Sequence, residues 1–132
     1  MIVKCLYKTI SNLSDDYLQA GYTKESVSDI KLESEYTVYG ISLWKGITLY
    51  LVFDETNMPN WYPANLFCIT DKSIPPNWFF SFEYENINDA VHSILGYKEL
   101  IDIESHFNDL IDRKKSALEI FYKRKHQIDH QC

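Results

Sequence analysis

Histidines are the side chains in this sequence most suited to metal binding or proton transfer, and the chain has four of them. His126 and His130 are four residues apart, a spacing that places both on one face of a helix, where they could hold a metal ion. A zinc-hydrolase HExxH motif needs glutamate after its first histidine, but this chain has Gln127 there. His92 and His106 have no ligand pattern around them, so we expect them at the surface or beside a helix. The sequence therefore predicts no metal site.

Serine, cysteine and carboxylate side chains give no better case for catalysis. A nucleophilic serine or cysteine needs a base held by the fold and a turn that exposes it, and the sequence has no G-x-S-x-G motif. With four glycines in the chain, no phosphate-binding loop is predicted. The adjacent Asp54 and Glu55 would face opposite sides of a strand. Glu83 and Glu85 would share one face, as acid–base catalysis requires, but no pattern indicates the apolar pocket that would raise the pKa of one of them, so we interpret them as solvated acids. We therefore predict that the protein is not an enzyme and holds no cofactor.

Acidic residues interleaved with large aromatic residues form the most distinctive pattern in the sequence. Trp61 and Tyr62 follow the acidic pair 54–55, while Trp78 follows Asp71 and a turn with two prolines. Rings that act as anchors and carboxylates that pair with Arg or Lys are typical of a surface that binds a basic protein. The alternative is that both tryptophans belong to the core. The candidate partner-binding residues are Asp54, Glu55, Trp61, Tyr62, Asp71, Trp78, Glu83 and Glu85.

The composition indicates one folded domain with an unusually large share of aromatic residues. The 132 residues fit a single domain over 1–132, and 15% of them are aromatic, more than a core of this size needs. Residues 1–112 carry 7 basic and 17 acidic side chains, whereas residues 113–132 carry 6 basic and 2 acidic ones. An acidic body repels the phosphates of nucleic acid and attracts a basic protein, so we expect a protein partner and no nucleic acid.

Cysteine usage and hydropathy predict a cytoplasmic protein. No run approaches the ~20 apolar residues that span a bilayer, and the first residues lack the features of a signal peptide. The three cysteines are an odd number without short spacing, which disfavours both a disulfide framework and a zinc site.

Residue periodicity predicts a β-rich part over about 1–85 and a helical part over about 86–127. A short helix is expected to begin after Ser14, and 54–60 reads as a polar loop. The predicted strands are 2–8, 36–44, 47–53, 65–70 and 78–83. The predicted C-terminal helices are about 87–95, ended by Gly96, and 104–126. The predicted fold class is α+β: a five-stranded antiparallel, SH3-like, partly open barrel with a short N-terminal helix and two C-terminal helices.

The stretch 36–80 resembles a known family of proteins. The resemblance rests on four segments: Tyr36-Thr37-Val38-Tyr39-Gly40-Ile41-Ser42-Leu43, Trp61-Tyr62-Pro63-Ala64, Leu66-Phe67 and Pro76-Asn77-Trp78. The stretch resembles bacterial immunity proteins that accompany polymorphic or contact-dependent growth-inhibition toxins. The resemblance covers about a third of the chain. It implies a protein that binds one toxin domain tightly and blocks its active site or its access to substrate. The family has no shared binding motif, so it assigns no binding residue.

Three hypotheses about function follow from these patterns. The first is an immunity protein that neutralises a cognate toxin domain, most simply a basic nuclease, by tight binding. The second is a small-barrel adaptor that recognises a peptide or protein in a groove lined by Tyr36, Tyr39, Trp61 and Trp78. The third is a small enzyme that uses acidic residues such as Glu83, or the histidines.

Overall fold

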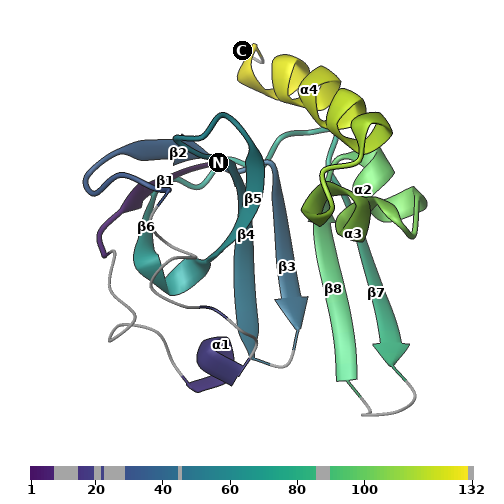
Figure 1. Ribbon diagram of the computed structural model, residues 1–132, viewed down its shortest axis with the longest axis horizontal. Helices are drawn as coiled ribbons and strands as arrows, with labels where there is room; N and C mark the ends of the chain where they lie inside the picture. The colour runs from purple at the N-terminus through teal and green to yellow at the C-terminus, as the bar shows by residue number, and fades with distance from the viewer. Residues whose placement is uncertain (8–14, 20–21, 23–28, 45, 86–89, 131–132) are drawn as a thin grey trace.

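A computed structural model describes residues 1–7, 15–19, 22, 29–44, 46–85 and 90–130, with the side chains of 44, 83–85, 90 and 91 outside that description. Within these residues the fold is α+β with antiparallel sheets, as predicted, but the strands form two sheets, of three and five strands. Figure 1 shows β1, β2, β4, β5 and β6 around a ring, with β7 and β8 to one side of it together with helices α2 to α4.

The three-stranded sheet joins distant parts of the chain. Its order is β2 (Glu35–Thr37), β1 (Ile2–Cys5) and β6 (Phe67–Asp71). Val3 faces Tyr36 on one side and Ile69 on the other, and the pairing of β1 with β6 shifts register between Ile2 and Val3. Such a bulge bends the strand, which helps a small sheet to curve.

The five-stranded sheet contains most of the β-structure. Its order is β5 (Pro59–Pro63), β4 (Ile47–Phe53), β3 (Gly40–Trp44), β8 (Ala90–Gly96) and β7 (Phe79–Glu85). The predicted strand 36–44 is in fact β2 and β3, one in each sheet. The chain crosses between the sheets at two buried residues: Val38 N–H donates to Met1 O, and Tyr39 N–H donates to Leu51 O. Pairing with different neighbours therefore divides one apolar run into two strands.

The described residues also form four helices. Helix α1 (Asp15–Gln19) lies where the short N-terminal helix was predicted, although its expected cap, Ser14, is outside the described residues. The predicted helix 104–126 is interrupted, forming α3 (His106–Ile111) and α4 (Lys115–Asp129), because Arg113 adopts a positive φ of 56°. A short helix α2 (Lys98–Asp102) precedes them, and a single 3₁₀ turn, η3 (Ala64–Leu66), joins β5 to β6.

The predicted helix 87–95 is wrong, because its C-terminal part is strand β8. In β8, Ile94 faces Ser42 and Ser81, and Leu95 faces Ile41 and Phe80. The helical spacing of the apolar residues is real, but β8 has a hydrogen-bonded strand on each side. That pairing outweighs a weak local preference.

Two groups of buried residues form the core, one on each side of β4. The first fills the ring of strands and consists of Val3, Cys5, Tyr17, Ile30, Tyr36, Val38, Ile47, Tyr50, Val52, Tyr62 and Leu66. The second lies between the five-stranded sheet and helices α2 to α4 and consists of Tyr39, Leu51, Trp61, Ile94, Tyr97, Leu100, Leu110, Ala117 and Phe121. The sheet therefore has two different faces: one turns into the ring, the other toward the helices.

A pair of glycines positions α2 on the sheet. Gly40 of β3 and Gly96 of β8 are directly opposite each other, and the buried Leu100 of α2 lies over them. A Cβ atom would stand 2.8 Å from Leu100 Cδ1 at Gly40 and 2.7 Å from it at Gly96, closer than carbon atoms can pack. Gly96, predicted as a helix terminator, instead leaves room for this leucine.

We expect Gly96→Ala to lower the free energy of unfolding by about 1–3 kcal/mol, because the new methyl group would overpack Leu100. In a Leu100→Ala background the methyl group has space, so its cost should fall to a small fraction of that value. Urea denaturation of the four proteins of this double-mutant cycle gives both numbers. An equal cost in the two backgrounds would mean that Leu100 is not what requires glycine.

Candidate functional site

One cross-strand row of side chains runs from the interior of the protein to its surface. The register places Phe80, Leu95, Ile41, Tyr50 and Tyr62 side by side across the five strands. Tyr50 and Tyr62 are buried in the ring, while Ile41 and Leu95 are half-buried and Phe80 is 59% exposed. The face of the sheet that forms the core at β4 and β5 thus continues outward over β7 without cover.

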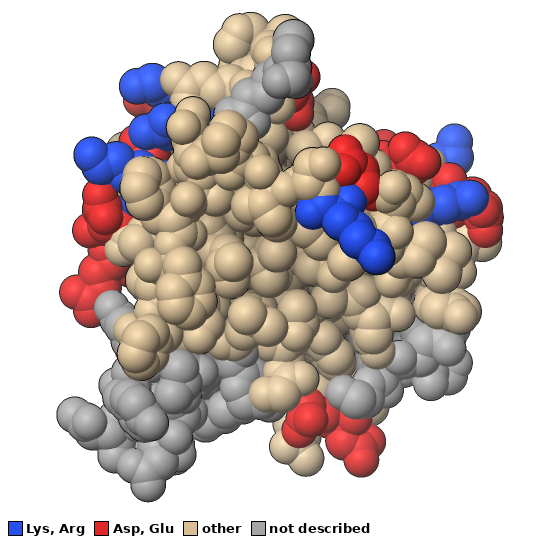
Figure 2. Space-filling model, turned by 180° about the vertical axis from the view of Figure 1, so that it is seen from behind, with Lys and Arg blue, Asp and Glu red and all other residues tan. Residues whose placement is uncertain are grey.

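The next row repeats this arrangement. Phe82, Ser93, Leu43 and Thr48 are opposite one another across β7, β8, β3 and β4. Phe82 is 59% exposed, and its ring lies 6.3 Å from that of Phe80. We call the surface made by Leu43, Phe80, Phe82 and Leu95 the aromatic face. Figure 2 shows a broad area of the molecule without Lys, Arg, Asp or Glu, with charged residues around its margins.

Strand β7 is also an edge strand, and its first half has little of the usual protection. It pairs with β8 over seven consecutive residues without a register shift, and no other described strand pairs with it. Natural edge strands are commonly blocked by charged residues, proline or a bulge; 79–85 contains no lysine or proline, and its charged residues, Glu83 and Glu85, lie in its second half. Phe79 adds a ring that is 51% exposed, on the opposite face of β7. An apolar edge segment beside an apolar face favours the addition of another strand.

The acidic pair predicted to belong to a binding surface is divided between the interior and the surface. Asp54 is 3% exposed and accepts hydrogen bonds from Thr56 N–H (2.9 Å), Asn60 Nδ2 (2.6 Å) and Tyr62 Oη (2.7 Å). Burial raises the pKa of the Asp54 carboxyl, but these donors outweigh it and hold that pKa below its ordinary value. Asp54 therefore fixes the β4–β5 turn, whereas the neighbouring Glu55 is exposed and accepts from Tyr36 Oη at 3.2 Å.

The predicted aromatic anchors are also packed inside. Trp61 and Tyr62 lie in β5, a strand that was predicted as part of a loop, and both are buried. Trp78 is half-buried against the first core group. The indole Nε1 atoms of Trp61 and Trp78 are buried without a hydrogen-bond partner among the described residues. These positions match the core alternative rather than an exposed anchor.

The remaining predicted residues are spread over the molecule. Asp71 ends β6, and its pKa is lowered because it accepts a hydrogen bond from Ser73 N–H at 2.9 Å. Glu83 and Glu85 belong to β7, next to the aromatic face in sequence, but their side chains are outside the described part of the structure. The six predicted residues whose side chains are described thus do not form one surface.

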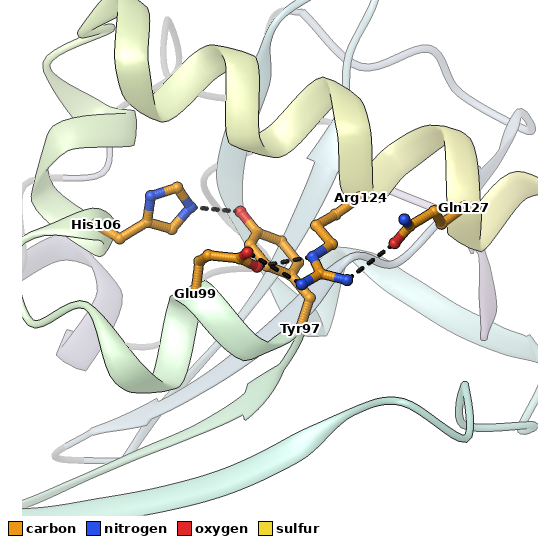
Figure 3. A network of polar contacts seen from close by, with 5 residues as sticks. All are labelled: Tyr97, Glu99, His106, Arg124 and Gln127. Atoms are coloured by element: carbon orange, nitrogen blue, oxygen red, sulfur yellow. Dashed lines mark hydrogen bonds and ion pairs between the residues drawn. The ribbon is translucent and has the colours of Figure 1, made fainter.

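His106 has an internal partner that the sequence did not predict. It begins α3, which agrees with the expected position beside a helix, but it is buried, 1% exposed, and its Nε2 lies 2.7 Å from Tyr97 Oη. Burial lowers the pKa of His106 below its ordinary value. Figure 3 shows this pair beside the bidentate contact of Arg124 with Glu99, at 2.7 and 3.0 Å. The network joins α2, α3 and α4, so its position indicates a structural role.

The described residues offer no metal site. His126 and His130 do lie together near the end of α4, with ring centroids 4.3 Å apart, but His130 Nδ1 contacts His126 O at 2.8 Å. In the described ranges no three His, Cys, Asp or Glu residues gather where they could hold a metal ion. Nor does any described helix have the length and hydropathy to cross a bilayer.

The residues of the aromatic face were not among those predicted for the site. The signal was present, because Trp78, Phe80 and Phe82 alternate along one predicted strand. Alternation alone places such residues on one face, without saying whether that face meets the core or the solvent. Comparisons with known proteins add no assignment: no family model, no curated protein and no solved structure matches this chain.

Proposed function

We propose that this chain is a non-enzymatic binding protein, an immunity protein that neutralises a cognate toxin domain by docking it on the aromatic face and the edge of β7. The observation that carries this proposal is the exposure of Phe80 and Phe82 on an edge strand that, among the described strands, pairs with β8 alone. Soluble proteins rarely leave a contiguous patch of large apolar side chains in water unless a partner covers it. Aromatic residues are also the usual anchors of protein interfaces.

Strand addition is the mode of binding that this surface supports. A partner strand beside β7 would satisfy its outward backbone N–H and C=O groups, and its side chains would extend the rows that begin at Phe80 and Phe82. Backbone pairing provides affinity, while contacts with the two rings provide selection of one partner.

Charge favours a basic toxin domain, such as a nuclease. Residues 1–112, which include the whole five-stranded sheet, carry 17 acidic and 7 basic side chains. A surplus of negative charge accelerates encounter with a positively charged partner and makes the rate sensitive to salt. Within this proposal the protein acts in the cytoplasm, where an inhibitor would meet a nuclease before its substrate.

We also propose that β1 to β6 form an SH3-like, partly open barrel, which the order of elements supports. Strand β1 pairs with both β2 and β6, β3 to β5 follow as a meander, and the single turn η3 stands between β5 and β6. The adaptor alternative receives less support, because three of the four rings proposed to line its groove, Tyr36, Tyr39 and Trp61, are buried.

Co-expression with the protein encoded by the neighbouring gene tests this function. We expect the chain to restore growth against a toxic neighbour and to co-purify with it. Phe80→Ser with Phe82→Ser should weaken the complex by at least about thirtyfold, about 2 kcal/mol, since interface anchors contribute at least this much. Titration calorimetry at fixed salt measures the loss.

A matched control keeps the experiment specific. Leu32→Ser removes an apolar side chain of similar exposure, 47%, from a turn distant in sequence from β7, and should change the affinity by less than about twofold. A double variant that binds and protects like the unchanged protein would remove the aromatic face from the interface. A neighbour that is neither toxic nor bound would count against the immunity function itself.

A further inference from the structure

A cleft of about 590 Å³ lies on the other face of the five-stranded sheet, turned toward α2 and α3 rather than toward the ring. Side chains of β3, β8 and β5 line its floor, and residues of α2 and α3, with Glu104 between the two helices, line its other side. Its volume is in the range of cavities that bind small organic molecules. The sheet separates this cleft from the aromatic face, because the two are lined by alternate residues of the same strands.

The half-buried ring of Phe107, which rests on the buried Trp61, forms part of the apolar wall of the cleft. Trp61 of β5 and Phe107 of α3 stack with centroids 4.6 Å apart and planes at 27°. Leu100 and Ile94 continue the apolar lining, and Phe107 is only half-buried. A planar, largely apolar molecule is the shape that such a wall favours.

A polar pair lies at the floor of the cleft. Ser42 Oγ is 2.9 Å from His92 Nε2, and Ser42 is 2% exposed. The backbone of β3 is paired with β4 on one side and β8 on the other, so it has no free N–H groups with which to stabilise an oxyanion at Ser42. This geometry suits a hydrogen bond to a bound molecule rather than attack on it.

One carboxylate belongs to the described lining of the cleft, and one arginine contacts the lining from outside it. The carboxylate is that of Glu104, which is exposed, and the described lining contains no lysine or arginine. Arg113 Nη2 donates to Asn60 Oδ1 at 3.3 Å, while Asn60 Nδ2 donates to Asp54. Aromatic rings attract cations, so Phe107 and Glu104 favour the same kind of ligand, whereas Arg113 disfavours a cation next to Asn60.

From these features we propose that the cleft binds a flat organic cation, an aryl amidine or aryl ammonium compound, with its ring against Phe107 and its charge toward Glu104. This site goes beyond docking of a toxin, and it lies on the opposite face of the sheet.

Three nearly isosteric probes test the proposal by charge alone. Benzamidine is cationic, benzamide neutral and benzoate anionic at pH 7. Titrations followed by ¹H–¹⁵N correlation spectra should show benzamidine binding most tightly and benzoate least, with shifts at the Trp61 indole N–H. Glu104→Gln should weaken benzamidine by about threefold, the size of an exposed ion pair, and leave benzamide unchanged. Glu119→Gln, which removes an exposed carboxylate from α4, should leave all three affinities unchanged.

Two results would overturn the proposal. One is benzoate binding as tightly as benzamidine; the other is no shift at Trp61 with any probe up to about 10 mM, the weak limit for a fragment-sized ligand. Phe80→Ser with Phe82→Ser should bind benzamidine normally, because those side chains lie on the other face of the sheet. A variant that loses toxin binding but keeps benzamidine binding therefore separates the two proposals. A variant that loses benzamidine binding but keeps toxin binding separates them as well.

Discussion

Replacing Asp54 with alanine is expected to lower the free energy of unfolding by about 3–5 kcal/mol, a large share of the stability of a domain of this size. The substitution leaves the hydrogen-bond donors of Thr56, Asn60 and Tyr62 facing a site without an acceptor. Tyr62 is 2% exposed, so water does not readily replace the lost carboxylate. Hydrogen bonds to a buried charge are worth more than neutral ones, which is why the effect should be large.

The same carboxylate should contribute to loss of stability in acid. Because its pKa is lower in the folded protein than in the unfolded chain, the folded state holds its proton less tightly. The stabilisation is complete above the unfolded value, about 3.9 for aspartate, and is lost as the pH falls through the folded value. Urea unfolding at pH 7 and at steps from pH 5 to pH 3 should show a smaller pH dependence in Asp54→Ala than in the unchanged protein.

Glu55→Ala is the matched control for Asp54. Glu55 is exposed, and its carboxylate accepts one contact, from Tyr36 Oη at 3.2 Å, so its removal should cost no more than about 1 kcal/mol. If Asp54→Ala cost as little as Glu55→Ala, the hydrogen bonds to Asp54 would not fix the turn.

Charge reversal at Asp54 is a poor test of a protein interface, because we expect it to unfold the protein. Glu55→Lys changes an exposed side chain and therefore tests the surface charge.

The parts of the fold that sequence reasoning predicted are those with strong local patterns. Residues 47–53 are all β-branched, leucine or aromatic, and β4 has these same bounds. The missed strand, β5, begins and ends with proline. Proline has no backbone N–H to donate to a neighbouring strand, so it usually indicates a turn. In β5 both prolines are at the ends of the strand, and among the described strands β5 pairs with β4 alone, so it is an edge strand that tolerates them.

The candidate site was harder to predict, because it depends on what covers each residue. Asp54 and Glu55 are neighbours in a polar loop, yet one is buried and the other exposed. Only the side chains brought from β5, Asn60 and Tyr62, account for the difference. Likewise, Tyr62 and Phe80 belong to one cross-strand row, and their exposure differs because the ring of strands closes over one end of the row. Neither fact is encoded in local spacing.

The largest effect of a core substitution is expected at Phe121, which attaches α4 to the sheet. Its side chain is 0% exposed, packs edge-on against Tyr39 with centroids 5.3 Å apart, and stacks on Phe53 at 6.3 Å. Phe121→Ala should lower the free energy of unfolding by about 3–5 kcal/mol, because it removes buried apolar area and leaves a cavity between helix and sheet. Chemical denaturation monitored by circular dichroism measures this loss.

Tyr122 provides the control at the next position of the same helix. It is 40% exposed, and Tyr122→Ala should cost no more than about 1–1.5 kcal/mol, since it keeps the buried ring in place. The polar contacts of α4, Arg124 with Glu99 and Tyr39 Oη with Asp129 at 2.6 Å, remain in both variants. If these contacts held α4 without Phe121, the two substitutions would cost the same. If the buried ring holds α4, Phe121→Ala should cost at least twice as much unfolding free energy as Tyr122→Ala and should increase amide exchange throughout α4.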